Sequence, residues 1–148
     1  MHRQYVLSRA LMMAMLIASP GVFAAQPARS HHVVLAGHRI SVEIASTDAA
    51  REHGLMNRTH MAVSHGMLFV YADAQPRYFW MKDTLIPLDI LFFGAQRRLI
   101  NVSADTPPCK ADPCPSYASA APAMYVLELN AGMAKSLGIK TGDEFKLD

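Results

Sequence analysis

The chain has 148 residues, 51% of them hydrophobic, and a formal charge of +2 at neutral pH. This length supports one domain with a substantial apolar core but hardly two. Two of the 14 basic residues and none of the 12 acidic ones lie in the first 24 residues, so the remainder is neutral and gives no case for binding nucleic acid or an anionic membrane.

The first segment has the order of a cleavable signal peptide. A basic lead precedes the apolar run 10–18, which is too short to span a bilayer. Helix-breaking residues at 19–21 then precede small residues at the positions that a signal peptidase reads, which predicts cleavage after Ala24. An uncleaved amphipathic anchor is the alternative. We therefore expect 1–24 to be a signal peptide and 25–148 to be one domain, without a stable membrane anchor, in the periplasm or outside the cell.

The first clear element after this segment is a strand. Residues 25–30 are small and polar and predict a frayed lead-in. Apolar and polar residues then alternate over 38–44, which is typical of a half-buried strand. Residues 46–48 offer a hydroxyl cap and an early acid for a short helix over 49–53, and Gly54 suits a left-handed end to that helix.

The middle of the chain predicts strands joined by turns. Apolar runs of strand length cover 66–71 and 88–93, and turn residues lead the second run into 99–102 as a hairpin. The segment 78–84 is aromatic and favours a strand, whereas Pro87 excludes a central-strand place for the residues just before the second run.

The end of the chain predicts two more strands and a second short helix. We expect a strand over 124–129, a short helix over 131–137 ended by Gly138, and a last strand over 143–147. No predicted helix is long enough for regular crossovers between parallel strands. The sequence therefore predicts a mainly β, β-rich α+β domain, a small barrel or sandwich with two short helices, and we expect it to be a monomer.

Both cysteines, Cys109 and Cys114, lie in a proline-rich loop that excludes helix and central strand. In an oxidising compartment two cysteines this close are expected to pair, and so short a closed loop stabilises by roughly 2–3 kcal/mol at best. Half of a metal site and a redox-active pair are the alternatives, although the spacing differs from the two-residue spacing of thioredoxin-like motifs. We predict a structural disulfide.

Motifs along the chain match one family pattern in order. They are Thr47, Arg51-Glu52, 54–58, 66–69, 79–89, 125–129, Gly132 and 138–143. On these residues the chain resembles the family catalogued as domain of unknown function 192. The resemblance implies a small β-rich domain, often exported in bacteria, with no established activity. Asp83 departs from the asparagine usual in the family and places a charge where the pattern has a neutral amide.

The segment from Trp80 to Asp89 intersperses polar groups among large apolar ones. In strand geometry it would aim Lys82 and Thr84 to one side and Asp83 to the other. Such a cluster suits a small-ligand site for a small molecule, glycan or peptide of the cell envelope. The candidate ligand-binding residues are Arg51, Arg58, Trp80, Lys82, Asp83 and Asp89.

The alternative is purely structural. In that interpretation Trp80 belongs to the core, Pro87 makes a bend, and Asp89 is an ion-paired or backbone-capping carboxylate near Arg51 or Arg58.

Two other functions remain open beside ligand binding. A hydrolase-type enzyme could use Asp83 and Asp89 as a carboxylate pair, or His65 with an acid, although neither spacing is diagnostic and no recognised serine, phosphate-loop or zinc motif is present. A metal-handling protein could bind Cu(I) through a methionine- and histidine-rich stretch. Its members are His53, Met56, His60, Met61, His65 and Met67.

The structural interpretation of that stretch is core filling by Met56, Met67 and Met81, with His31-His32 as a tail. We predict a non-catalytic accessory or ligand-binding module of the envelope with no cofactor and no metal site.

Overall fold

A computed structural model describes residues 31–148 of the chain. The predicted signal peptide at 1–24 and the lead-in at 25–30 lie outside the described residues. Within 31–148 no helix is both long and apolar enough to cross a membrane.

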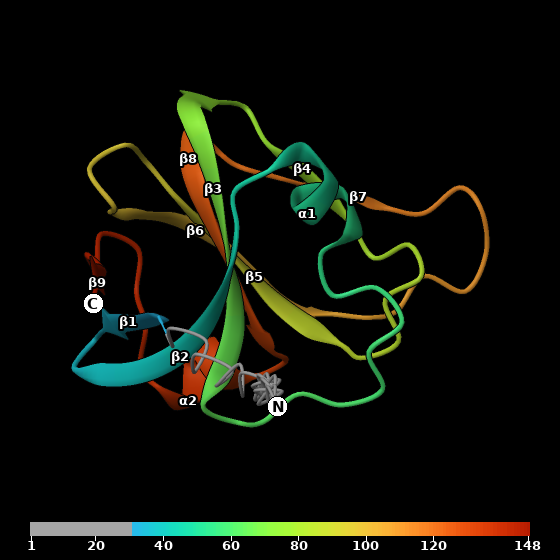
Figure 1. Ribbon diagram of the computed structural model, residues 1–148, viewed down its shortest axis with the longest axis horizontal. Coiled ribbons are helices and arrows are strands. Elements are labelled where there is room, and N and C mark those ends of the chain that lie inside the picture. The colour runs from blue at the N-terminus through green and yellow to red at the C-terminus, as the bar shows by residue number, and fades with distance from the viewer. Residues whose placement is uncertain (1–30) are drawn as a thin grey trace, which may run out of the picture.

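Seven strands form one twisted sheet in the order β6-β5-β8-β3-β2-β1-β9 (Figure 1). Neighbouring strands are antiparallel except β2 and β3, which run parallel. The strands of this sheet are β1 (His31–Leu35), β2 (His38–Ala45), β3 (His65–Gln75), β5 (Leu88–Phe93), β6 (Leu99–Thr106), β8 (Ala123–Asn130) and β9 (Lys146–Leu147).

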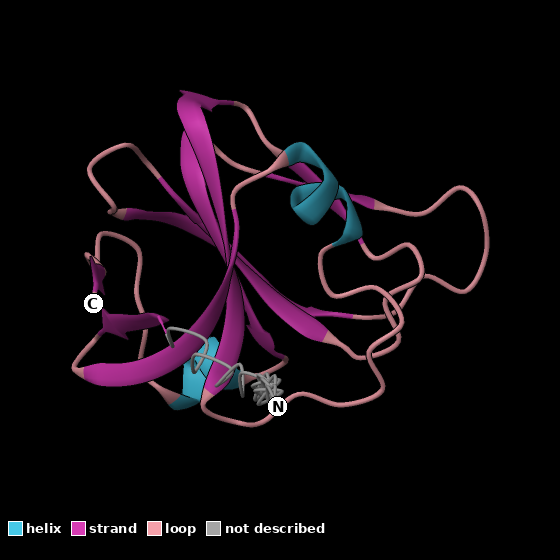
Figure 2. Ribbon diagram, viewed as in Figure 1, coloured by secondary structure: helices cyan, strands magenta, loops and turns pink. Residues whose placement is uncertain are grey.

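The parallel pair of β2 and β3 requires a long connection. After β2 the chain must run back to the edge of the sheet where β2 begins before β3 can follow the same direction. That connection contains helix α1 (Asp48–His53) and the irregular segment 54–64. Two more strands, β4 (Tyr78–Trp80) and β7 (Ser116–Ala118), form a separate two-stranded sheet. The other helix, α2 (Met133–Ser136), follows β8, and strands clearly dominate the fold (Figure 2).

Side chains of the central strands alternate between two cores, one on each face of the sheet. In β8, Leu127 and Leu129 join the core that includes Ala134 of α2, and we call this side the α2 face. Val126 joins the other core, where Phe79 of β4 packs and where Ala50 of α1 packs partly buried, and we call this side the α1 face. Each fully buried large apolar side chain contributes roughly 1.5–3 kcal/mol, so the sheet between the two cores is the stable frame of the molecule.

The predicted fold class is confirmed. The domain is mainly β with two short helices among the described residues, and its sheet is not closed into a barrel, so it is sandwich-like. The helix at 49–53 is confirmed with its cap, since Thr47 Oγ1 accepts a hydrogen bond from the Ala50 N–H at 3.2 Å. The hairpin of β5 and β6 is also confirmed.

Several local predictions were wrong. His31 and His32, predicted to be a tail, begin β1, which pairs with β2, and β7 was not predicted at all. The strand expected over 78–84 ends at Trp80, because Asp83 adopts a left-handed φ of 52° that no strand accommodates. The strand expected over 143–147 is reduced to β9 and one isolated bridge between Arg98 and Glu144.

Candidate functional site

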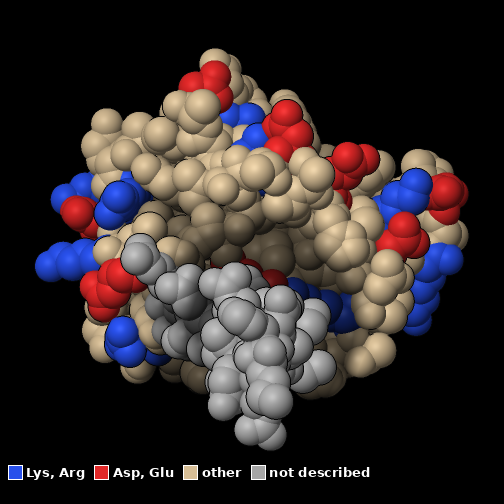
Figure 3. Space-filling view, viewed as in Figure 1, with Lys and Arg blue, Asp and Glu red and all other residues tan. Residues whose placement is uncertain are grey.

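A cleft lies between α1 and the turn that follows β4. Both α1 and β4 are labelled in the upper right part of Figure 1. The outer part of the cleft has a volume of about 450 Å³, which is within the range of roughly 300–1,000 Å³ usual for small-molecule sites. The lining residues are Ala49, Glu52, His53, Met56, Trp80, Lys82 and Asp83. The molecule is also visibly hollowed on the side from which it is viewed in Figure 3, with acidic and basic groups inside the hollow.

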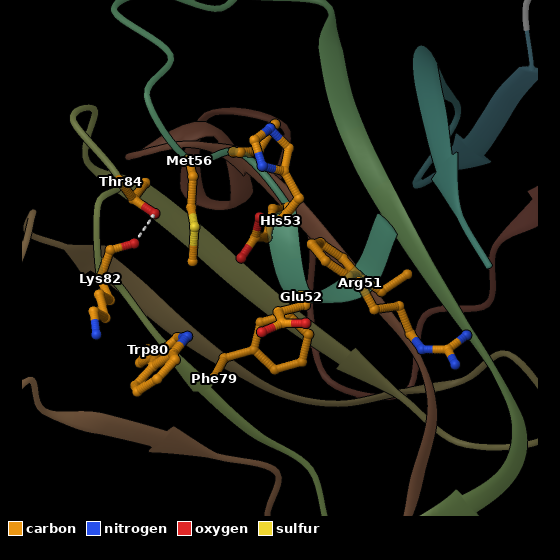
Figure 4. A pocket seen from close by; sticks show the side chains of 12 residues that line it. Arg51, Glu52, His53, Met56, Phe79, Trp80, Lys82 and Thr84 are labelled. Atoms are coloured by element: carbon orange, nitrogen blue, oxygen red, sulfur yellow. Dashed lines mark hydrogen bonds between the residues drawn. The ribbon is translucent and has the colours of Figure 1, made fainter. Parts of the chain in front are cut away.

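The cleft continues inward as a narrow pocket of about 40 Å³. The two parts share the walls formed by Glu52, His53, Met56, Trp80 and Lys82. Figure 4 shows the Met56 thioether and the Trp80 ring on either side of the space between α1 and the turn. A pocket of this size accepts a head group of a few heavy atoms and nothing as large as a sugar ring.

Glu128 forms the floor of the inner pocket. It lies in the middle of β8, where its cross-strand neighbours are Met67 in β3 and Ile90 in β5. The residue is only 5% exposed, and its carboxyl takes part in no side-chain hydrogen bond or salt bridge of the described residues. No fully buried side-chain oxygen within 31–148 lacks a partner, so the carboxyl oxygens of Glu128 are open to the inner pocket. Burial among apolar neighbours raises the pKa of Glu128 to about 8.

Trp80 forms a wall of the cleft rather than part of the core. Its side chain is 54% exposed, so the interpretation of Trp80 as a core residue was wrong. The Lys82 Nζ lies 5.4 Å from the centre of its ring, a weak cation–π contact at an exposed site. The exposed aromatic surface is therefore available to a ligand in the outer cleft.

The turn after β4 is held by backbone hydrogen bonds. The Asn57 N–H donates to the Asp83 carbonyl at 2.8 Å, and both residues adopt left-handed φ values, 61° and 52°. Asparagine and aspartate tolerate this conformation better than other non-glycine residues. An aspartate at position 83 therefore meets the same backbone requirement as an asparagine, and its carboxylate adds negative charge to the outer cleft.

Asp89 does not belong to this site. It is fully buried, and its side chain joins the α2 face. There Oδ1 accepts hydrogen bonds from the N–H groups of Asp105 at 2.8 Å and Gly132 at 3.1 Å, and Oδ2 accepts one from Ala134 at 2.8 Å. The backbone-capping role considered for Asp89 is confirmed, but its partners are these N–H groups and neither of the two arginines. Asp83 and Asp89 therefore do not form a carboxylate pair.

The two candidate arginines are used to fasten the cleft wall. The Arg51 guanidinium donates to the carbonyls of Ser46 and Val70 and pairs with Asp48, and Figure 4 shows it pointing away from the other labelled side chains. Arg58 pairs with Glu43 in β2 at 2.6 Å, which ties the segment after α1 to the sheet.

His65 does pair with an acid, outside the cleft. Its Nε2 lies 2.9 Å from Glu43 Oε1 and its Nδ1 lies 2.8 Å from Ser41 Oγ. The hydrogen bond from Arg58, aided by His65 and opposed by partial burial, lowers the pKa of Glu43. Ser41 Oγ also lies 3.1 Å from the Ser64 carbonyl, a second acceptor within reach of its single hydroxyl proton. These contacts join β2 to β3 at a place outside the cleft.

The methionine- and histidine-rich stretch is divided between several places. Met67 is buried in the core of the α1 face, Met61 packs against it, and both ring nitrogens of His65 already have partners. His53 and Met56 line the cleft. Within 31–148 no group of three histidine, cysteine, aspartate or glutamate side chains is arranged to hold a metal ion.

The predicted disulfide is confirmed. Cys109 and Cys114 are bonded, with Cα atoms 5.6 Å apart. The Cys109 N–H donates to the Met81 carbonyl at 3.3 Å, and the cysteine loop and Lys82-Asp83 together line a hollow of about 200 Å³ beside the cleft. The disulfide thus braces the turn that carries the cleft wall.

The candidate residues from the sequence are therefore only partly brought together. Trp80, Lys82 and Asp83 line the outer cleft, Arg51 contributes to the inner wall, and Arg58 and Asp89 serve elsewhere. Sequence reasoning did not single out Glu128, although a charged residue inside the apolar run 124–129 was a visible signal.

The family model DUF192, described as "Uncharacterized ACR", matches residues 31–147. The chain belongs to the DUF192 family. None of the curated proteins matches it. Two solved structures resemble this DUF192 domain, both with a TM-score of 0.73.

One of these structures is a protein of unknown function from Novosphingobium aromaticivorans, which is 38% identical over 78% of this chain and 83% of that chain. The other is a Sinorhizobium meliloti protein described as a "putative transcription regulator", which is 35% identical over 82% of this chain and 97% of that chain.

Proposed function

We propose that this DUF192 domain is a small-ligand-binding module whose site is the cleft between α1 and the turn after β4. The observation that carries the proposal is a cleft of about 450 Å³ that narrows onto Glu128, a buried carboxyl without a partner within 31–148. A carboxyl that is surrounded by apolar side chains and reaches only a narrow pocket is poorly solvated, so a ligand that donates a hydrogen bond to it there is favoured.

The walls of the cleft fit this role. Trp80 offers an exposed aromatic surface, Met56 offers an adaptable apolar one, and Glu52 and Lys82 carry opposite charges. Neither Glu52 nor Lys82 forms a salt bridge within 31–148, so both are available to orient a ligand. Mostly apolar walls with a few convergent polar groups are the usual composition of ligand sites.

The place of action in this proposal is the periplasm or the outside of the cell. The signal-peptide pattern of 1–24 supports export, and a disulfide persists in an oxidising compartment. The ligand is accordingly a small molecule, a glycan fragment or a peptide of the cell envelope.

The charge distribution of this chain gives no support to a DNA-binding role. Nucleic-acid binding needs a clustered positive face, and basic residues balance acidic ones once 1–24 are set aside. Five of the arginines within 31–148 are also paired with carboxylates, which lowers the charge available to phosphates. The five paired arginines are Arg39, Arg51, Arg58, Arg77 and Arg98.

A thermal-shift screen against glycans, peptidoglycan fragments, short peptides and small amines tests the proposal. A ligand present at about 100 times its Kd stabilises the folded state by roughly 2.7 kcal/mol, which is easily measured. Trp80 is the only tryptophan in the chain, so its fluorescence reports binding in the outer cleft directly.

We expect at least one ligand class to raise the melting temperature, and Trp80→Ala to abolish that rise while remaining folded. Val63→Ala is the matched control, because Val63 is also an exposed apolar residue, 69% accessible, and is not among the residues of the cleft walls. If no class raises the melting temperature, or if the rise survives in Trp80→Ala, the cleft is not the binding site.

A further inference from the structure

The chemistry of the inner pocket specifies its ligand further, on the assumption that the cleft binds a ligand as proposed. Glu128 lacks a hydrogen-bond donor among the described side chains, and two donors that line the same pocket, Arg51 and Thr84, are used elsewhere. The Arg51 guanidinium is committed to two carbonyls and Asp48. Thr84 Oγ1 donates to the Lys82 carbonyl at 3.3 Å, a bond drawn in Figure 4. No described side chain therefore donates to this carboxyl.

The shape of the inner pocket limits what can supply the donor. The pocket measures about 40 Å³, and Phe69, Phe79 and Trp80 contribute to its walls. The faces of aromatic rings attract cations, and a charged donor makes the strongest hydrogen bonds to a carboxylate. Glu52 adds an acidic group without an ion pair to the same wall. A compact ammonium group satisfies all of these features, whereas a sugar ring or a guanidinium plane is too large.

We infer that the cleft takes a primary amine, whose ammonium group enters the inner pocket and pairs with Glu128 while the rest of the ligand lies against Trp80. Lys82 lies over Trp80 at the outer end of the cleft. An amine that also carries an acidic group finds a partner there, and amino acids and peptide ends carry both groups.

Binding of such an amine is coupled to release of a proton to solvent. The carboxyl of Glu128, with a pKa of about 8, is mostly protonated at pH 7 in the free protein, and the ammonium pairs with the carboxylate form. An alkylamine stays charged up to about pH 10. The association constant should therefore rise about tenfold per pH unit between pH 6 and 7 and level off above about pH 8.

Other titratable groups face the same space and must be separated from Glu128. They are Arg51, Glu52 and His53 on α1 and Lys82 on the turn, and Tyr71 on β3 lies close enough for Glu128 to affect its pKa. Of these, His53 lines both parts of the cleft, so its contribution must be separated from that of Glu128 by substitution. A His53→Gln variant removes that contribution and keeps Glu128.

The experiment is a titration of Trp80 fluorescence with 2-phenylethylamine and with 2-phenylethanol, which differ in one terminal group. Each compound is titrated from pH 6 to 9 into the purified protein and into its Glu128→Gln and His53→Gln variants. We expect the amine to bind at least about tenfold more tightly than the alcohol at pH 8. We also expect the pH dependence to persist in His53→Gln and to vanish, with most of the affinity, in Glu128→Gln.

The inference is overturned if the alcohol binds as tightly as the amine, if Glu128→Gln binds the amine as well as the unchanged protein does, or if neither compound binds. The proposed function survives any of these results when another ligand class raises the melting temperature in a Trp80-dependent way. The proposed function fails in its own right when no ligand class raises the melting temperature in a Trp80-dependent way.

Discussion

Two buried carboxylates in this DUF192 domain lie in opposite environments. Asp89 accepts three backbone N–H groups, and Glu128 accepts none within 31–148. Both are almost inaccessible, at 0% and 5% exposure. Asp89 stabilises the start of α2, whereas Glu128 is a cost to the fold. A group that weakens the fold in a cleft of ligand size is a candidate for function.

The cost of Glu128 should appear as a pH dependence of stability. Its pKa lies at about 8 in the folded protein and near the ordinary 4.5 when unfolded. The folded state therefore holds the proton more tightly across this window, and stability falls as the pH rises from about 4.5 to 8. Glu128→Gln, which cannot ionise, should raise the free energy of unfolding by roughly 2–4 kcal/mol at pH 8 and by much less at pH 5.

Urea denaturation of the two proteins at both pH values measures this difference. Glu52→Gln is the matched control, because it removes an acid from the wall of the same pocket and leaves Glu128 in place. This variant should change the free energy of unfolding by less than about 0.5 kcal/mol at either pH. Equal or lower stability of Glu128→Gln at pH 8 would show that Glu128 has a partner in the folded state.

At the scale of elements, the cleft lies between two segments that are each attached to the rest of the fold. One is α1 with the segment that follows it, and the other is the turn after β4. Arg51 fastens α1 to β3 through the Val70 carbonyl, and Arg58 fastens the following segment to β2 through Glu43. On the other side, the turn after β4 is braced by the Cys109 N–H. The walls are thus positioned by backbone and ion-pair contacts while the cleft between them stays open.

Reduction of the disulfide should loosen one wall only. The closed loop is short, so loss of the bond should cost roughly 2–3 kcal/mol at most. Hydrogen exchange with and without reductant should show faster exchange around 81–84 and 107–115 and unchanged protection in β3, β5 and β8. Loss of protection in those central strands would mean that the disulfide supports the whole fold.

Elements with local patterns were predictable from the sequence, and elements that depend on distant partners were not. The alternation of apolar and polar residues in β2 and the cap of helix α1 depend only on neighbouring residues, and both elements were predicted. The parallel pairing of β2 with β3 depends on a connection of irregular chain, and β7 is stabilised as a strand by its partner β4. Neither leaves a periodic signal in its own segment.

The site shows the same division. The segment from Trp80 to Asp89 drew attention to the correct turn, but the sequence could not show that Trp80 faces solvent while Asp89 faces the opposite core. Glu128 was passed over because an acid within a strand is ordinary at a solvated face. Its depth becomes apparent only when Met67 and Ile90 are seen on either side of it.

At the scale of the whole molecule, the sheet carries two cores and only one of them is incomplete. The core of the α2 face includes Ala134 of α2 with Ile139 and Phe145 from the end of the chain, and on this face the Asp89 carboxylate is fully hydrogen-bonded. The α1 face is covered by α1, β4 and β7, and the cleft between these covers opens a narrow path to Glu128. A stable sheet with a preformed cleft on its α1 face suits the binding of small molecules without a large change of shape.

The proposed binding site depends on Glu128 lying without a partner at the inner end of this cleft. The most direct measurement is an NMR titration that follows the side-chain carboxyl carbon of Glu128 as the pH is raised from 4 to 10. We predict a midpoint of about 8, from the burial of the carboxyl among apolar neighbours. A midpoint near 4.5 would contradict the account, because it would mean that the carboxylate is solvated or already paired.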